Sequence, residues 1–137
     1  MLKTKTDCHS VVLMNNIAAA LAQQRPVTEP GTPPPSPSQL RDSGRVWARR
    51  ALELADNIKP PMRDEECDHG CVVATHNLGE FAEMDGNVAE ARERYEQAGS
   101  IAHAIGFEEG VISANEGLKR LKAPPVKKSK KSGFWSR

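Results

Sequence analysis

The sequence predicts an all-α protein in which about two and a half helical hairpins stack into an α-α superhelix. Three observations predict this fold class. Apolar residues recur at three- and four-residue steps in five segments, as they do on one face of a helix. Glycines and prolines separate these segments. Aromatic residues make up only 4% of the 137 residues, so the core must consist mainly of small and aliphatic side chains, which suit close helix packing.

Residues that favour the start or the end of a helix set the limits of the five expected helices. Asp64 and Asn87 are suitable N-caps, because their side chains can accept hydrogen bonds from the free amides at a helix start. Pro60 and Gly106 are suitable stops. The expected helices span about Asp7 to Gln24, Ser38 to Ile58, Asp64 to Met84, Asn87 to Ile105 and Glu108 to Leu121.

Composition divides the chain into four parts. Six of the ten prolines fall between Arg25 and Ser38, a density that excludes helix and sheet. Lys119 to Arg137 carries eight basic residues and no acidic one, which leaves a charge of −7 for the rest of the chain. We expect residues 1–24 to form an N-terminal repeat helix, 25–38 a disordered Pro-rich linker, 39–122 the helical repeat region and 123–137 a disordered basic tail.

The expected helices are copies of two types. Residues 70–74 (GCVVA) of the third helix align with residues 110–114 (GVISA) of the fifth, and the first helix fits the same pattern. Residues 48–55 of the second helix share the spacing of their small residues with residues 95–102 of the fourth. The order of types is therefore A, B, A, B, A, as in a stack of hairpins.

The unit from about Asp64 to Ile105 resembles the tetratricopeptide repeat (TPR) family. Leu78-Gly79 matches the Leu-Gly of the first TPR helix, Ala91-x3-Tyr95-x2-Ala98 matches the second, and Asp85-Gly86-Asn87 resembles the turn between them. In such a stack the small residues let antiparallel helices approach closely, and the large ones fill the gaps between hairpins. The residues expected to pack the repeat are Leu78, Gly79, Ala91, Tyr95 and Ala98.

The chain also departs from the family pattern. Thr75 stands where Trp is usual and Ala82 where Tyr is usual, and the copies lie 40 and 61 residues apart instead of about 34. Residues 67–121 resemble the C-terminal part of longer fungal TPR proteins, some of them linked to mitochondria. This resemblance implies an intracellular protein, in the mitochondrion or alternatively in the cytoplasm. Because repeat arrays generally need about three units, we expect so short an array to be part of a larger assembly, or an oligomer.

The TPR resemblance implies a non-catalytic scaffold that binds a peptide or a partner helix. In the family the first helices of successive pairs line a concave groove that holds the ligand. Glu80 and Glu83 favour a neutral or basic ligand, whereas a clamp for a terminal carboxylate would need cations at Ser113 and Gly117. The groove residues expected from the resemblance are Asn15, Asn16, Ala19, Val73, His76, Asn77, Glu80, Ser113 and Gly117.

Side-chain chemistry gives no sign of catalysis. The three cysteines, an odd number without framework spacing, are expected to be thiols in a reducing compartment. Cys67 and Cys71 lie four residues apart and could supply two metal ligands, but the favoured interpretation is that they are small buried packing residues. No nucleophile, phosphate-binding or paired-carboxylate motif is recognisable. We therefore expect no enzyme activity, no metal and no cofactor.

The C-terminal tail suggests an alternative function. Lys127 to Arg137 combines clustered cations with Phe134 and Trp135, a composition that favours contact with nucleic acid or an anionic membrane. The alternative is therefore a tether that acts through this tail. The scaffold interpretation instead expects a protein or peptide partner and no nucleic acid. No stretch approaches the roughly 18 apolar residues of a membrane span, so no transmembrane segment is expected.

Overall fold

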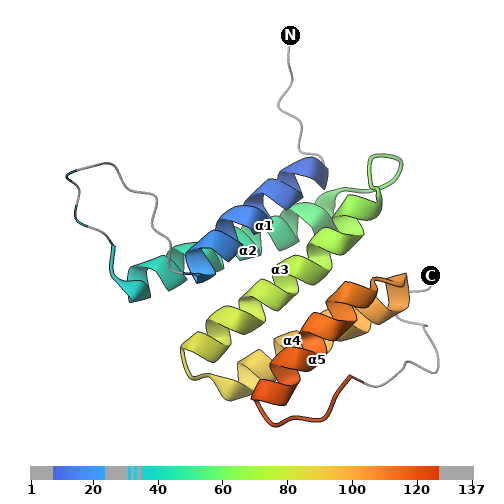
Figure 1. Ribbon diagram of the computed structural model, residues 1–137. Helices are drawn as coiled ribbons and strands as arrows, with labels where there is room; N and C mark the ends of the chain where they lie inside the picture. Colours follow the sequence, from blue (N-terminus) through green and yellow to red (C-terminus); the bar gives the residue numbers. More distant parts are fainter. Residues whose placement is uncertain (1–7, 24–30, 32, 34, 127–137) are drawn as a thin grey trace.

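The structure is a computed structural model that describes residues 8–23, 31, 33 and 35–126 (Figure 1). Within these residues it contains five helices and no strand, which confirms the all-α fold class. The helix ends lie within about two residues of the expected ones. The helices are α1 (Cys8–Ala22), α2 (Pro37–Asn57), α3 (Glu65–Met84), α4 (Val88–Ile105) and α5 (Glu108–Arg120).

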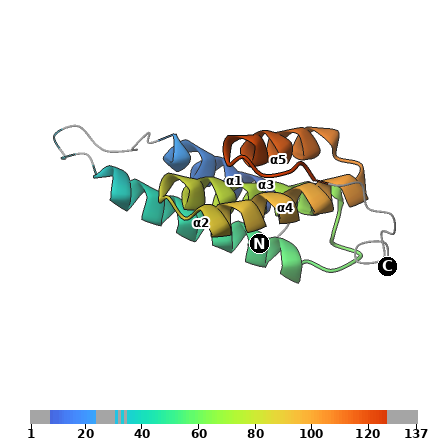
Figure 2. The same cartoon turned by 90° about the horizontal axis from the view of Figure 1, so that it is seen from below.

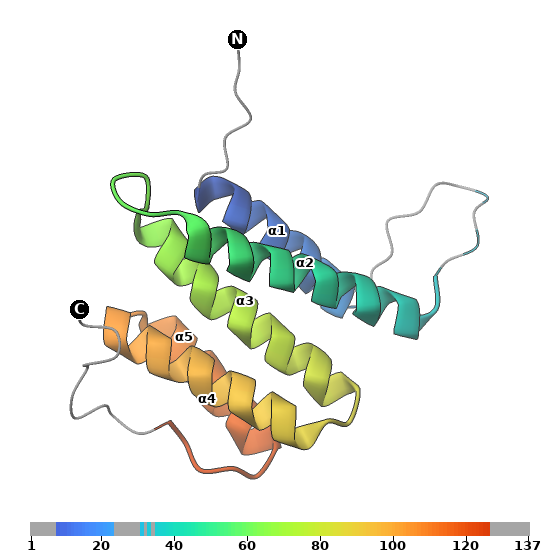
Figure 3. The ribbon, with the colours of Figure 1, turned by 180° about the vertical axis from the view of Figure 1, so that it is seen from behind.

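The helices form two layers. α1, α3 and α5 lie in one layer, and α2 and α4 cover its back (Figures 1 and 2). Figure 3 shows α2 and α4 from behind, with α3 between them. α1 packs against α2 and α3, while α4 packs against α3 and α5. This is the A, B, A, B, A order that the sequence predicts, arranged as a TPR-like superhelix.

The helix starts follow from capping side chains. The Ser36 side chain accepts a hydrogen bond from the Gln39 amide (3.1 Å), and the Gln39 side chain accepts one from the Ser36 amide (2.8 Å). Pro37 then occupies the first position of α2, where no amide hydrogen is needed. Asp64 and Asn87 cap α3 and α4 through one side-chain oxygen each, which accepts a hydrogen bond from the Glu66 and Glu90 amide, respectively. Each helix that begins at one of these three caps therefore has a local signal in the sequence.

Tyr95 of α4 joins the second half of the stack. Its side chain is fully buried. A Cβ atom added at Gly79 of α3 would lie 2.9 Å from the Tyr95 ring, and one added at Gly117 of α5 would lie 2.7 Å from it. The ring therefore fits between α3 and α5 because neither helix carries a side chain there. Leu78, Ala91 and Ala98 are also buried.

The Tyr95 hydroxyl continues this contact as a polar network. It donates a hydrogen bond to Glu83 of α3 (2.6 Å), and Arg120 of α5 donates two hydrogen bonds of 3.1 Å to the two oxygens of the same carboxylate. Burial opposes ionisation of Glu83, but the hydrogen bonds from Arg120 and Tyr95 outweigh it and hold the pKa of the carboxyl below its ordinary value. The network therefore connects α3, α4 and α5.

The lowered pKa of Glu83 predicts an acid-dependent stability. A carboxyl whose pKa is lowered in the folded state adds stability above its unfolded pKa and loses it as the pH falls through the folded pKa. We expect the free energy of unfolding to fall as the pH drops below about 4.5, and to fall less in Glu83→Gln. Urea unfolding across this pH range measures the slope. The exposed Glu93 provides the control, and a Glu93→Gln slope as shallow as that of Glu83→Gln would contradict the prediction.

Two cysteines form a disulfide, so the expectation of three thiols is wrong for Cys8 and Cys67. The bond joins α1 to α3, with the Cα atoms 4.9 Å apart and a sequence separation of 59. α1 lies beside α3, and the first residues of the two helices meet where Val11 packs against Gly70. Sequence spacing could not reveal this, because the pairing depends on how α1 docks after the Pro-rich segment.

Cys71 is the free cysteine. It is buried, and its sulfur lies 3.6 Å from an Asp56 carboxylate oxygen and 3.7 Å from the Arg63 guanidinium. Burial raises the pKa of the Cys71 thiol. Arg63 also donates hydrogen bonds to the carbonyls of Ala55 and Ile58 at the end of α2. Cys71 thus packs beside a helix-capping arginine, and with Cys67 in a disulfide the pair does not offer two thiolates.

The described chain continues past α5. Ala123 and Val126 pack against the Tyr95 cluster, and the Val126 amide donates a hydrogen bond to the Asn115 side chain (2.8 Å). Ala123 and Val126 thus contact the helices that surround Tyr95. The expectations for residues 1–7, 24–30, 32, 34 and 127–137 lie outside the described residues. They include the start of the N-terminal segment, most of the linker and the basic tail.

Candidate functional groove

A hollow of about 490 Å³ lies between α3 and α5. We call it the α3–α5 groove. Its lining is mainly apolar. One lining residue, Ile112, has a large hydrophobic side chain that is 52% exposed. A concave apolar surface with a few polar groups is the usual form of a binding site. The groove is lined by Val72, Val73, His76, Phe107, Glu109, Gly110, Ile112 and Ser113.

Two aromatic contacts hold the walls of the groove. His69 of α3 stacks on Phe107, which precedes α5, with ring centroids 4.1 Å apart. His76, one of the lining residues, packs against Tyr95 at 5.1 Å. α5 makes few direct contacts with α3, because the Tyr95 side chain of α4 lies between them. The hollow is therefore a direct consequence of how the hairpins stack.

The charged side chains around the groove are mainly acidic. Glu109 is exposed on its α5 wall. The His76 Nε2 lies 3.6 Å from the Glu80 carboxylate, and its Nδ1 is buried without a hydrogen-bond partner among the described residues. A second hollow of about 430 Å³ adjoins the His69–Phe107 stack and is lined by Pro60, Arg63, Asp64, Glu65, Asp68, His69 and Ile105.

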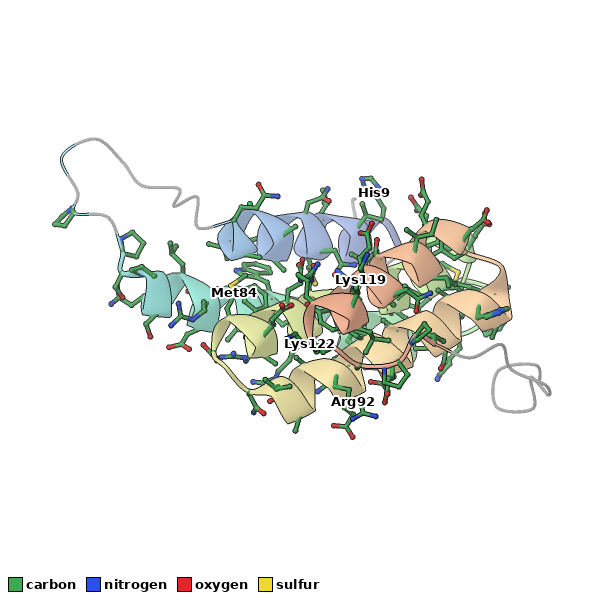
Figure 4. The ribbon with its side chains drawn as sticks, turned by 60° about the horizontal axis from the view of Figure 1, so that its bottom comes forward. His9, Met84, Arg92, Lys119 and Lys122 are labelled. Atoms are coloured by element: carbon green, nitrogen blue, oxygen red, sulfur yellow. A yellow bond between two sulfur atoms is a disulfide. The ribbon has the colours of Figure 1, made fainter. Side chains whose placement is uncertain are left out.

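The residues expected to line a groove occupy three different environments. Val73, His76 and Ser113 line the hollow, and Glu80 lies beside it through its contact with His76. Asn16 is exposed on α1. His9 projects from α1 on the side opposite to Arg92 of α4 (Figure 4). The expected groove residues therefore do not all line one pocket.

Asn15 and Asn77 lie below the surface. Asn15 is 4% exposed, and its Nδ2 donates a hydrogen bond to the Gly70 carbonyl of α3 (3.1 Å). Asn77 is 3% exposed, and its Nδ2 has no hydrogen-bond partner within the described part of the chain. Asn15 thus links α1 to α3. A ligand on the described surface would not reach either side chain directly.

Sequence analysis missed several lining residues. Phe107 sits in the turn between α4 and α5, and Ile112 and Glu109 lie on the exposed side of α5. A signal was present for Ile112, because it falls out of phase with the buried Ala114 and Leu118 of the same helix. The turn position of Phe107 gives no such signal.

Comparison with known proteins gives one informative match. No protein-family model matches the chain, and no solved structure matches it. The chain is 28% identical over 127 residues to a TPR repeat-containing protein of Schizosaccharomyces pombe. The chain is similar to TPR proteins. The resemblance predicted from the sequence is thereby confirmed, and it extends over 92% of this TPR-like chain while spanning 35% of the yeast protein.

None of the described helices is both long enough and apolar enough to cross a membrane. The described part of the chain also has no group of three or more His, Cys, Asp or Glu side chains placed to hold a metal ion.

Proposed function

We propose that this TPR-like chain is a non-catalytic scaffold that binds a segment of a partner protein in the α3–α5 groove. The observation that carries the proposal is the hollow beside Ile112, whose side chain is largely exposed at the edge of an apolar surface. Such surfaces favour association, because removing apolar surface from water is favourable by about 25 cal/mol per Å². The similarity to a TPR repeat-containing protein supports a protein partner.

The groove also has the shape that a short segment needs. Its floor is α3 and its wall is α5, so a bound segment would lie along two helices of the same layer. TPR arrays in general bind through the layer formed by their first helices. Here those helices are α1, α3 and α5.

Cross-linking at the groove tests the proposal. We expect a photoreactive residue placed at Ile112 to form a cross-link with a partner protein, and the cross-link to disappear when Ser113→Arg fills the hollow. The matched control is Val88 of α4, which is also 52% exposed but lies on the other layer. Equal cross-linking from Ile112 and Val88 would argue against the groove.

The same experiment separates the scaffold from a tail-driven tether. The basic segment Lys127 to Arg137 lies outside the described residues. The proposal expects the Ile112 cross-link to persist when this segment is deleted. Loss of the cross-link on deletion, with binding that weakens steeply as salt is raised, is the result expected of a tether.

A further inference from the structure

The chemistry of the groove indicates what kind of segment it takes. Resting on the function proposed above, we propose that the bound segment is a short, extended, basic stretch of a partner protein that carries one large apolar side chain. The apolar side chain would sit over Val73 and Ile112, and the cations would lie towards the first turn of α3, near Asp64, Glu65 and Asp68.

Charge complementarity selects a basic segment. Four carboxylates and one guanidinium line the α3–α5 groove and the adjoining hollow. The guanidinium, Arg63, lies 2.8 Å from Asp68 and also donates to carbonyls at the end of α2, so it is not available to an acidic ligand. Glu65 and Glu109 are exposed, and within the described structure neither carboxylate forms a salt bridge with a Lys or Arg side chain. A basic segment would meet an attractive field, and an acidic one a repulsive field.

The apolar part of the segment is selected by the groove itself. Val72, Val73, Phe107 and Ile112 provide the apolar walls, and among the described residues Glu109 is the one acid that lines this hollow. A charged side chain seated here would lose its water without gaining a partner, which is costly. A large apolar side chain would instead cover Ile112. The groove therefore favours an apolar residue of the segment, and the adjoining hollow favours its basic residues.

The separation of the two hollows sets a spacing. Val73 lies five to eight positions after Asp68 and Glu65 on α3, which is roughly 8–12 Å along the helix axis at 1.5 Å per residue. An extended segment covers this distance in about three or four residues. We therefore expect the apolar residue and the cations to be separated by about three or four positions in the partner sequence.

Synthetic peptides added to the full chain test this chemistry. The probe is Gly-Ser-Lys-Lys-Gly-Ser-Phe-Gly-Ser, capped at both ends, together with its reversed sequence to allow for either direction. Two controls replace the lysines by Glu or the Phe by Ser. We expect the probe, in one direction, to shift the amide signals of Val73, His76 and Ser113 in an NMR titration. Either control should bind at least about tenfold more weakly.

Matched variants locate the effect on the protein. Glu65→Lys reverses a charge in the hollow where the cations are placed, and Glu93→Lys makes the same change at an exposed site on α4. We expect Glu65→Lys to weaken binding of the probe by about tenfold and Glu93→Lys to leave it unchanged. Both positions are exposed, so both variants should fold.

The outcomes distinguish this inference from the proposed function. If the Glu-containing peptide shifts the same amides as strongly as the probe, the groove binds peptides but the basic preference is wrong. If the probe shifts only amides of α2 and α4, or if no peptide shifts the groove amides, the inference is overturned. Cross-linking at Ile112 then decides separately whether the groove holds a partner at all.

Discussion

Replacing Tyr95 by alanine is expected to lower the free energy of unfolding by about 3–5 kcal/mol, the range for removing a fully buried aromatic side chain. The ring fills the space between Gly79 and Gly117, so its removal leaves a cavity between α3 and α5. The two glycines cannot fill that cavity, because they have no side chains. Urea unfolding followed by circular dichroism measures the loss.

Tyr95→Phe is the matched control. It keeps the ring but removes the hydroxyl that bonds Glu83 and accepts a hydrogen bond from Arg120 (3.2 Å). We expect it to cost about 1.5–3 kcal/mol, the range for hydrogen bonds to charged groups. If Tyr95→Ala cost no more than Tyr95→Phe, the ring would not be the element that holds the hairpins together.

Reducing the Cys8–Cys67 disulfide is expected to destabilise the fold by about 4 kcal/mol. The bond closes a loop with a sequence separation of 59, and the loss of loop-closure entropy in the unfolded chain scales with that length. The effect should be large because α1 joins the rest of the chain through the Pro-rich segment, so the disulfide is its covalent link to α3. Urea unfolding with and without dithiothreitol measures the difference.

A variant without the bond provides the control for this prediction. The double variant Cys8→Ala/Cys67→Ala should match the reduced wild-type chain and should not respond to dithiothreitol. The remaining thiol, Cys71, is buried and does not form a bond with either position. A wild-type chain whose unfolding is the same with and without the reductant would show that the bond does not stabilise the fold.

Local signals explain why so much of the fold could be predicted. Asp64 and Asn87 cap α3 and α4 through bonds of their own side chains to nearby amides, so the sequence alone shows where these helices begin. Gly79 and Tyr95 are each predicted to pack the repeat, because small and large residues alternate in the repeat pattern. Both kinds of signal act within one hairpin.

Features that depend on docking between hairpins could not be predicted. Cys8 and Cys67 meet only because α1 lies beside α3, and nothing in either segment indicates this partner. Asn15 has the appearance of a surface polar residue, but its bond to Gly70 places it in the α1–α3 interface. Phe107 reaches the groove through its stack with His69. In each case the deciding contact lies on another helix or turn.

The close fit of the Tyr95 ring is the claim on which the groove depends, since the ring holds α5 away from α3. NMR measurement of nuclear Overhauser effects between the Tyr95 ring protons and the α-protons of Gly79 and Gly117 tests it most directly. We expect strong effects to both glycines, and upfield shifts from the ring current. Effects to only one glycine, or to neither, would contradict the stacked arrangement and the α3–α5 groove with it.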